Sequence, residues 1–450
     1  MAIGFDYGTA NCSVAQMVNQ TARLIPLVGE DYYIPSTLSA PTPEALSEYL
    51  FRCLNILPTS GGGESVLRRA IKLNREEGLE IIANEIRFGQ EALASYLDDP
   101  RDVYYVKSPK SFLGVMGLRD MQLSFFEDLV CAMMANIKHQ AEKVLQDDMT
   151  QTVIGRPVNF LGRGGEQSNF QAEGILRRAA TRAGFKDIEF QFEPLAAGLD
   201  FEASLKEDKH VLVVDIGGGT TDCSFVQMGP SWVGKQDRSA SLIAHCGQRI
   251  GGNDLDIFTA FRCFMHEFGL GSKSLAGLDI PTTQFWNPIA INDVQAQRTF
   301  FDRSNLKVLR QLLKQSQQPE KVARLVQLYT QTLGHSVVRE AEQAKIALAE
   351  QPSYLASIDL ISETIETPVT RESLEQAIHN PTEKIKSLVD EAIRQSHIRP
   401  DVVYMTGGSS RSPILTAAVE SVLPDTPLAS GNDFGSVTAG LARWAETIYR

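Results

Sequence analysis

The stretch that decides the fold of this chain runs Val211-Leu212-Val213-Val214-Asp215-Ile216-Gly217-Gly218-Gly219-Thr220-Thr221-Asp222-Cys223-Ser224-Phe225-Val226-Gln227-Met228. Its first four residues are aliphatic and mostly β-branched, as a buried strand requires. The segment after the glycines alternates and also predicts a strand, so the glycine-rich loop joins two strands. A Walker-type phosphate loop runs instead from a strand into a helix and carries Gly-Lys followed by Ser or Thr, which is absent from this loop.

A related stretch near the start of the chain runs Ile3-Gly4-Phe5-Asp6-Tyr7-Gly8-Thr9-Ala10-Asn11-Cys12-Ser13-Val14-Ala15-Gln16-Met17. When Thr9 is aligned with Thr220, five of the nine positions through Met17 and Met228 are identical. In both copies a short apolar run, an Asp and a Gly precede the Thr. Coincidence between two buried hairpins is the alternative interpretation. The matching Asp-x-Gly-Thr core favours two related halves, each opening on a strand–turn–strand unit.

Both turns have the chemistry of an anion site. Glycines let backbone N–H groups converge on an anion, because a side chain would block the approach and exclude positive φ. The threonine hydroxyl adds a donor, whereas the aspartate beside it would repel a bare phosphate. A divalent cation between them resolves this conflict, since Mg²⁺ prefers a few carboxylates, waters and phosphate oxygens. Two such turns facing each other would clamp a Mg–nucleotide across a cleft between two lobes.

Length and composition exclude several classes of protein. The chain has 450 residues with 43 basic and 55 acidic side chains, a net charge of −12. At about 150 residues per domain, this length suggests about three units. A hydrophobic share of 43% is ordinary for a folded chain, and the acidic balance argues against a general binder of nucleic acid or anionic membranes. No apolar run approaches the ~20 residues that span a bilayer, and the N-terminus lacks the basic region of a signal peptide. We therefore expect a cytoplasmic protein with no nucleic-acid or membrane partner.

Six cysteines are scattered along the chain: Cys12, Cys53, Cys131, Cys223, Cys246 and Cys263. No pair has CxxC spacing, so the sequence supports neither a zinc site nor a redox dithiol. A disulfide framework is not expected either, because the chain is long and poor in cysteine. We expect most of them to be small buried hydrophobes.

Two short segments place charged side chains where they can reach the cleft. Lys107 and Lys110 stand on a predicted loop that opens a helix. One of them is within reach of a γ-phosphate in this interpretation; the alternative is a solvated surface pair. Glu193 precedes Pro194, and proline suits the first turn of a helix because its missing N–H costs nothing there. Glu193 therefore brings a carboxylate to the cleft from a helix start, unless it only caps that helix.

Two further glycine turns follow. Gly251-Gly252 precedes a helix predicted at 256–266, whose N-terminus suits an anion, although loop closure would also use glycines. Gly407-Gly408-Ser409 follows a buried strand and permits the close approach of a flat base, on which Arg411 can stack. The alternative for Arg411 is a surface position at a helix start. A mostly helical lobe is predicted between these turns, followed by a helix capped by Thr382.

These landmarks, in this order, resemble the nucleotide-binding domain of the DnaK-type heat-shock chaperones, the heat-shock protein 70 family, and look most similar to its short YegD-type branch. The resemblance runs along almost the whole chain. It implies an α/β fold of the actin/hexokinase-like (ribonuclease H-like) kind, a duplicated two-lobe ATPase with smaller inserted subdomains. Lobe I is expected at 1–205, with 433–450 packing back on it and an inserted subdomain at about 30–115. Lobe II is expected at 206–432, with a mostly helical insertion at about 253–350.

The resemblance also implies roles for individual residues. Asp6 and Asp215 would position a hydrated Mg²⁺, with Glu193 holding a water in its shell. Lys110 would orient the attacking water and neutralise developing charge, and Asp222 would help to orient or deprotonate that water. The other implied residues are the catalytic Thr220 and the nucleotide-binding Gly8, Thr9, Ala10, Asn11, Gly217, Gly218, Gly219, Gly251, Gly252, Glu342, Lys345, Gly407, Gly408, Ser409 and Arg411.

Three positions depart from the family pattern. Ala10 stands where a second threonine is usual, and Asn253 replaces the usual Glu of Gly-Gly-Glu-Asp. The terminal Asn-Pro-Asp motif appears as Gly431-Asn432-Asp433. These changes are expected to slow hydrolysis or to alter its coupling to lobe closure. The β-rich peptide-binding domain of the family is missing from the sequence, so peptide capture in its usual groove is not expected within this chain.

The sequence thus predicts a Mg-dependent slow ATPase that binds ATP and ADP. The resemblance implies a chaperone-like role in protein folding, with unfolded client proteins reached through a separate partner. Two alternatives stay open: a nucleotide-gated scaffold or binding module without turnover, and a small-molecule kinase of the same superfamily. Retention of Lys110, Glu193 and Asp222 favours hydrolysis, and no sugar-kinase signature accompanies the shared core.

Overall fold

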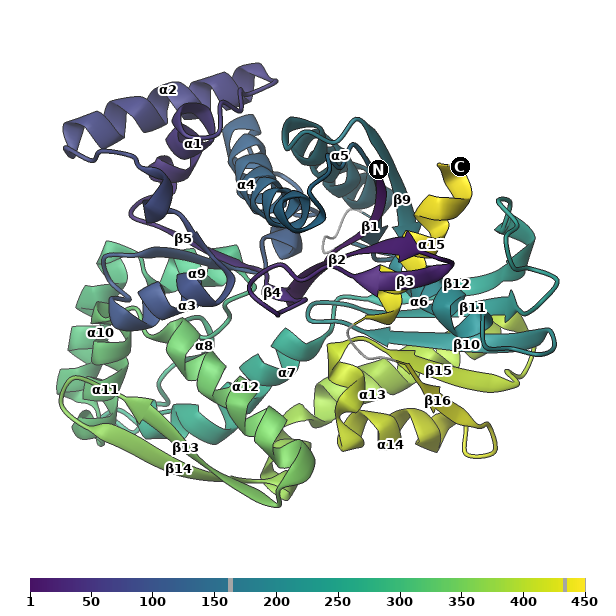
Figure 1. Cartoon of the computed structure of the whole chain (residues 1–450). Helices are drawn as coiled ribbons and strands as arrows, with labels where there is room; N and C mark the ends of the chain where they lie inside the picture. Colours follow the sequence, from purple (N-terminus) through teal and green to yellow (C-terminus); the bar gives the residue numbers. More distant parts are fainter. Residues whose placement is uncertain (161–164, 432–434, 450) are drawn as a thin grey trace.

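The structure is a computed structural model that describes residues 1–160, 165–431 and 435–449 (Figure 1). Asn432 and Asp433, which the sequence places in the family's terminal motif, lie outside the described residues. The expected lobe boundary between positions 432 and 433 therefore also lies outside them.

Two central sheets have the same topology. The first has the strand order β3-β2-β1-β8-β9 and the second β12-β11-β10-β15-β16. In each, the first three strands in sequence are antiparallel neighbours, and the last two add in parallel beside the first. The strands of the first sheet are β1 (Ala2–Tyr7), β2 (Asn11–Val18), β3 (Thr21–Leu24), β8 (Gln151–Arg156) and β9 (Asp187–Phe192), with β4 (Ile34–Pro35) paired to β2. Those of the second are β10 (Lys209–Ile216), β11 (Thr221–Met228), β12 (Leu242–Gln248), β15 (Val402–Thr406) and β16 (Leu428–Ser430).

The helices repeat in the same way, which shows the duplication expected from the sequence. In the first half they are α4 (Asp120–Leu145), α5 (Glu166–Arg182) and α6 (Glu193–Glu202), and in the second α13 (Arg371–Ser396), α14 (Pro413–Val422) and α15 (Ser436–Ile448). The last helix of each half crosses over: α6 packs on β10 and β11, and α15 packs on β1, β2 and β8 (Figure 1). The two helices also pack on each other, so the halves are joined through this pair.

Each half carries an insertion after its third strand. The first contains a three-stranded sheet with helices: β5 (Thr37–Ala40), α1 (Pro43–Arg52), α2 (Gly61–Glu76), β6 (Arg87–Phe88), α3 (Gly89–Asp98) and β7 (Tyr104–Lys107). The second is larger and mostly helical: α7 (Gly252–Thr259), α8 (Thr283–Trp286), α9 (Val294–Phe300), α10 (Arg303–Gln315), α11 (Pro319–Thr330), α12 (Gly334–Glu350), β13 (Ser353–Asp359) and β14 (Thr364–Thr370).

The central strands read as continuous apolar runs because both of their faces are covered. Val211, Leu212, Val213 and Val214 of β10 are all fully buried. Helix α6 covers one face of this sheet and α13 packs on β11 and β12. Strands covered on both faces, as in parallel sheets, favour apolar and β-branched residues at every position rather than an alternating pattern.

Two predicted helices begin elsewhere than expected. The helix predicted at 256–266 starts four residues earlier as α7 and continues as a π-helical turn (Ala260–Phe264) and a 3-10 turn (Met265–Phe268). The helix expected to start at Thr382 is the second part of α13, which begins at Arg371. Thr370 caps it, whereas the Thr382 hydroxyl donates to the Ile378 carbonyl inside the helix at 2.9 Å.

Candidate functional site

The two duplicated turns meet in the middle of the molecule. A Cβ built on Gly218 would lie 2.7 Å from Ala10 Cβ, and one on Gly219 would lie 2.8 Å from Thr9 Cγ2. The strands that precede them, β1 and β10, belong to different sheets. The turns therefore face and touch each other, and only glycine permits so close an approach here.

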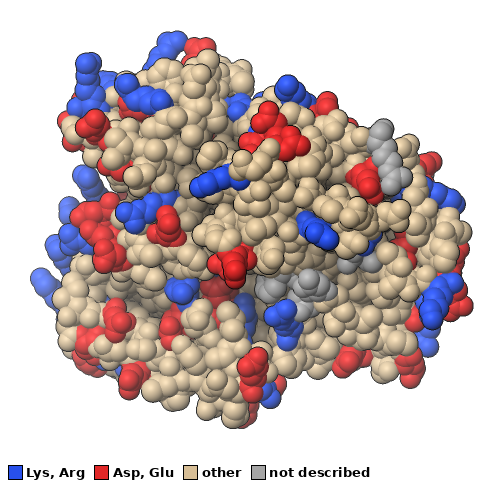
Figure 2. All heavy atoms as spheres, viewed as in Figure 1, with Lys and Arg blue, Asp and Glu red and all other residues tan. Residues whose placement is uncertain are grey.

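A cavity of about 640 Å³ opens beside these turns. Its walls come from both hairpins, from the turn after β15, from the start of α7 and from α12. On the face shown in Figure 2, basic and acidic side chains are interspersed. An anion in the cavity would therefore be held by the backbone and the lysines near it rather than by a surface field of one sign.

The second turn is fixed by hydrogen bonds to α7. Gly252 N donates to Gly217 O at 2.9 Å, and Asn253 N donates to Gly218 O at 2.7 Å. Within the turn, Gly217 N donates to Thr220 O at 2.9 Å. These bonds occupy the carbonyl groups of the turn and hold the loop rigid against the helix.

Four carboxyl groups and one lysine gather behind the turns. Lys110 is buried, and its Nζ donates to Glu193 Oε1 at 2.5 Å and to Gly155 O at 3.2 Å. Asp222 is also buried and accepts a hydrogen bond from Val158 N at 2.9 Å. Asp6 stands on β1 and Asp215 on β10, the equivalent central strands of the two sheets, and both line the cavity.

Burial and mutual repulsion hold protons on this cluster. Burial, and then the negative charge of Glu193, raise the pKa of Asp6 to about 7, while Lys110 lowers it. The same two causes raise the pKa of Asp222 to about 7, and they raise that of Asp215 well above its ordinary value. A cation placed among these groups would relieve the repulsion, since an opposite charge within a few ångströms favours the charged form.

The far end of the cavity is lined by side chains from α12. Lys345 Nζ lies 2.6 Å from Asp256 Oδ1 and donates to Gly252 O at 3.3 Å. Glu342 Oε2 lies 3.2 Å from Lys107 Nζ. Burial by itself raises the pKa of Glu342, but Lys107 and Lys345 outweigh it and hold the pKa below its ordinary value. Both acids are thus paired with lysines, and the cavity wall here is polar and close to neutral.

Most of the residues predicted from the sequence line this one cavity. They are Asp6, Gly8, Thr9, Ala10, Asn11, Glu193, Asp215, Gly217, Gly218, Thr220, Gly252, Glu342, Lys345, Gly407, Gly408, Ser409 and Arg411. Four lie directly behind its wall. Lys110 contacts it through Glu193, Asp222 stands on β11 behind the second turn, Gly219 abuts Thr9, and Gly251 abuts the backbone of the second turn.

Further residues of the cavity were not among the predicted site residues. Tyr33 lines the cavity and is half-buried; burial, with the charge of Asp6, raises its pKa. It comes just before β4, and only the pairing of β4 with β2 brings it to the site, so no local motif marks it. Asn253 also lines the cavity, and its Nδ2 donates to Ser108 Oγ at 3.1 Å. A hydrogen bond between neutral groups thus occupies the position where the usual Glu of the family pattern would bring a charge.

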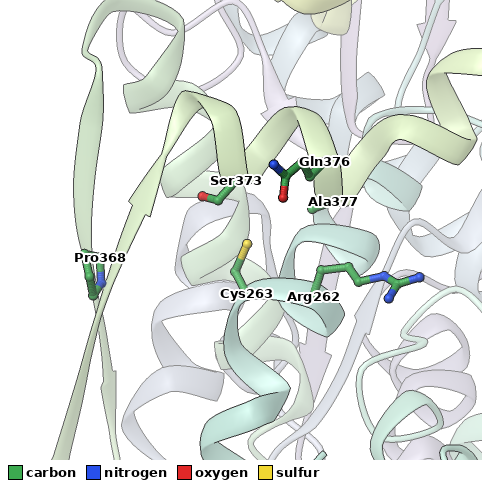
Figure 3. A pocket seen from close by; sticks show the side chains of 6 residues that line it. All are labelled: Arg262, Cys263, Pro368, Ser373, Gln376 and Ala377. Atoms are coloured by element: carbon green, nitrogen blue, oxygen red, sulfur yellow. The ribbon is translucent and has the colours of Figure 1, made fainter.

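A second, smaller cavity of about 370 Å³ lies elsewhere and contains none of the predicted residues. Figure 3 shows its six lining side chains, which come from the π-helical turn, β14 and α13. Cys263 points toward Ser373, whereas the Arg262 guanidinium points away from the other labelled side chains.

Two kinds of feature are absent from the described part of the chain. No helix in residues 1–160, 165–431 and 435–449 is both long and apolar enough to cross a membrane. In the same residues, no cluster of three or more His, Cys, Asp or Glu side chains is arranged to hold a metal ion by itself.

The duplicated sheets, the crossed final helices and the facing turns define an actin-like ATPase fold. A profile of the protein family described as Hsp70 protein matches residues 117–274 and 306–448, which is more than half of the chain. The chain belongs to the Hsp70 family.

Its relatives include chaperones. The chaperone protein HscA homolog of Rickettsia prowazekii (strain Madrid E) is 27% identical over 265 residues, which cover 58% of this chain and 38% of the relative. The HscA homolog of Rickettsia conorii (strain ATCC VR-613 / Malish 7) is 26% identical over 372 residues, which cover 81% of this chain and 54% of the relative. The matched region thus spans about half or less of these relatives.

Proposed function

We propose that this protein binds Mg–ATP in the cavity between its halves and hydrolyses it slowly to ADP and phosphate. The observation that carries the proposal is the contact between the two glycine turns. Behind these turns lies a buried cluster of carboxyl groups together with Lys110. Phosphoryl transfer needs positioning, charge neutralisation and an oriented nucleophile more than covalent chemistry. These residues offer all three.

The phosphates would lie between the turns. The backbone N–H groups of Gly8 and Thr9 are assigned to the β-phosphate, and those of Gly218, Gly219 and Thr220 to the γ-phosphate. Support comes from the cavity lining, which includes residues of both turns. Glycine at these positions leaves the N–H groups open to an anion.

The residues fit a magnesium ion held through water. Asp6 and Asp215 line the cavity, and burial together with the charge of Glu193 raises the pKa of both carboxyl groups, so a bound cation would favour their ionised forms. Mg²⁺ is commonly held by one or two carboxylates, several waters and substrate phosphates. Bound there, it would neutralise phosphate charge.

The hydrolytic step is assigned to residues behind the second turn. Water attacks the γ-phosphorus, the bond to ADP breaks, and the water proton passes to a base. Asp222 suits that task because its pKa is about 7, near the optimum for a general base at neutral pH. Lys110 and Glu193 form a pair that orients the water, and Lys110 offsets developing negative charge. Thr220 adds a donor to the γ-phosphate.

The adenosine would occupy the far end of the cavity. Glu342, Lys345, Gly408, Ser409 and Arg411 line it, from α12 and the turn after β15. Pairing with lysines leaves Glu342 ionised and able to accept hydrogen bonds from hydroxyl groups of a sugar.

We further propose the two lobes at 1–205 with 433–450, and at 206–432, as the bodies that close on the nucleotide. Membership of the Hsp70 family supports a chaperone-like role in protein folding, with client proteins reached through a separate partner. All six cysteines are free thiols, which suits a reducing compartment such as the cytoplasm.

The test is a single-turnover experiment with purified protein and Mg–ATP, without acceptor or partner. Release of ADP and phosphate, lost in Asp222→Asn while ATP binding persists, is the expected result. Tight ATP binding without turnover would contradict the ATPase and favour a nucleotide-gated module or a kinase that awaits its acceptor. No binding at all would contradict the whole proposal.

A further inference from the structure

Two cysteines stand directly opposite each other on neighbouring strands. Cys223 of β11 is the register partner of Cys246 of β12, and the strands are antiparallel (Figure 1). Opposite residues in an antiparallel pair have Cα atoms about 4.5–5.5 Å apart and point to the same face of the sheet. A disulfide needs Cα atoms about 4.4–6.8 Å apart. The backbone therefore already holds the two thiols at a distance that a disulfide can join.

The pair has the character of a reactive thiol beside a resolving thiol. Cys223 is fully buried, whereas Cys246 is partly exposed. The two thiols are hydrogen-bond partners, and this bond lowers the pKa of Cys246. Cys246 also lies 3.5 Å from the Leu388 carbonyl of α13, so the pair sits between the sheet and that helix. A thiol with a lowered pKa and partial exposure is the kind that oxidants attack.

Asp222 lies next to the two cysteines on the same pair of strands. Asp222 precedes Cys223, its register partner is Gly247, and Gly247 follows Cys246. Side chains alternate along a strand, so Asp222 and the thiols point to opposite faces of the sheet. A Cβ on Gly247 would collide with the Asp222 carboxylate, which shows how closely β12 backs that side chain. A change in the local spacing of β11 and β12 must therefore move Asp222 relative to its partner Val158 N.

We propose that Cys223 and Cys246 are a reversible redox site, at which a peroxide forms a cross-strand disulfide that displaces Asp222. The site itself is independent of the nucleotide cavity. Its effect on hydrolysis rests on the function proposed above.

The chemistry balances with hydrogen peroxide as the oxidant. The Cys246 thiolate attacks one peroxide oxygen, the O–O bond breaks, and the products are a sulfenic acid and, after protonation, water. The Cys223 thiol then attacks the sulfenic sulfur, the S–O bond breaks, and a second water leaves as the disulfide forms. Both sulfurs are oxidised by one electron each, and a dithiol reductant reverses the change.

Two other cysteines show why this pair is distinctive. Cys12 is the counterpart of Cys223 in the first half, yet its Sγ lies 3.7 Å from Ser36 Oγ rather than facing a thiol. Cys263 is partly buried beside Ser373 (Figure 3). The duplication thus placed a cysteine in both hairpins, but a thiol partner stands opposite it only in the second.

The first test maps the disulfide in the full chain. Protein is treated with hydrogen peroxide, blocked with N-ethylmaleimide and digested with trypsin without reductant. Trypsin yields the peptides 210–235 and 239–249, which hold Cys223 and Cys246 respectively. Their disulfide-linked pair is expected after oxidation and should disappear with dithiothreitol. Recovery of both peptides singly alkylated, or linkage to other cysteines, would overturn the site.

The second test measures the coupling. Hydrogen exchange of the Val158 amide, which donates to Asp222, should quicken at least tenfold on oxidation in wild type and in Cys263→Ser, but not in Cys246→Ser. ATP turnover should fall at least tenfold in the same samples and recover with dithiothreitol. A disulfide that forms without either change would overturn the displacement of Asp222. If reduced protein never turns over ATP, the proposed ATPase fails, while peptide mapping and exchange still decide the redox site.

Discussion

Replacing Lys110 by methionine tests the centre of the proposed mechanism. Lys110 is 4% exposed and its Nζ donates to Glu193 Oε1 at 2.5 Å. It also lowers the pKa of Asp6, Asp215 and Asp222. Methionine fills a similar volume without charge, so Lys110→Met removes the ammonium and leaves the packing nearly intact.

The magnitude follows from what the ammonium does in the site. Loss of one preorganised charge-stabilising donor costs about 10²–10³ in rate, or about 2.7–4 kcal/mol of transition-state stabilisation. Breaking a buried ion pair costs about 3–5 kcal/mol of folding stability. We expect the low end for stability, because Asp6 and Asp222, with pKa values of about 7, can take up protons near neutral pH. The chemical step should therefore slow about a hundredfold or more in a folded protein.

The assay is single-turnover hydrolysis at saturating Mg–ATP, with affinity measured separately by calorimetric titration. Lys107→Met is the matched control, since Lys107 pairs with Glu342 at 3.2 Å and stands at the other end of the cavity. We expect it to weaken nucleotide binding while the rate of the chemical step stays near wild type. A Lys110→Met rate within threefold of wild type, in a folded protein that binds ATP, would refute the assignment of Lys110.

Three further predictions concern the metal, the second turn and acid stability. Asp215→Asn should lower the Mg-dependent part of nucleotide affinity at least tenfold, and titrations with and without Mg²⁺ that give equal loss would contradict the metal assignment. Gly251→Ala would place a Cβ 2.7 Å from backbone atoms of the second turn, so ATP affinity should fall, whereas Gly61→Ala, which meets open space, should leave it unchanged. Burial, then Lys107, lower the pKa of His335 from 6.5 to about 3, so the unfolded state binds the extra proton. Stability should fall with pH below 6.5, by about 2 kcal/mol at pH 5 from this residue alone. Urea unfolding of His335→Gln should lose that share of the pH dependence, and a variant of the exposed His266 should keep it.

The duplicated hairpins were predictable because their signals are local. Each consists of a strand, a turn and a strand within about twenty residues, and the repeat of Thr, Cys, Ser, Gln and Met ties the copies together. The helix at 371–396 was only half predicted, because Pro381 and Thr382 together imitate a helix start. Proline removes one hydrogen bond from a helix interior. The helix continues because Ala377, Ile378, Ile385 and Leu388, on both sides of the proline, are buried in the core.

The parts of the site that sequence could not predict depend on pairings between distant segments. Tyr33 reaches the cavity only through the pairing of β4 with β2. Cys223 and Cys246 are 23 residues apart, and the absence of CxxC spacing argued against a redox dithiol. The antiparallel register nevertheless places them side by side, which their spacing along the chain does not indicate. Spacing rules describe ligands on one turn or helix, whereas register depends on the whole sheet.

Polar contacts between the two insertions, at the far end of the cavity, connect the proposed nucleotide release to opening of the molecule. Lys107, the last residue of the first insertion, and Ser108 after it meet Glu342 and Asn253 of the second, and the Tyr96 hydroxyl donates to the Thr332 carbonyl. Behind them, α6 and α15 pack on each other and on the opposite sheets. If the two lobes move as proposed, a rotation about the α6–α15 pair would separate these polar contacts. If nucleotide binds as proposed, breaking those bonds should speed its release, because Glu342 and Asn253 themselves line the cavity. The same side chains would then hold the nucleotide and hold the cleft shut, which is the arrangement that a nucleotide-dependent switch needs.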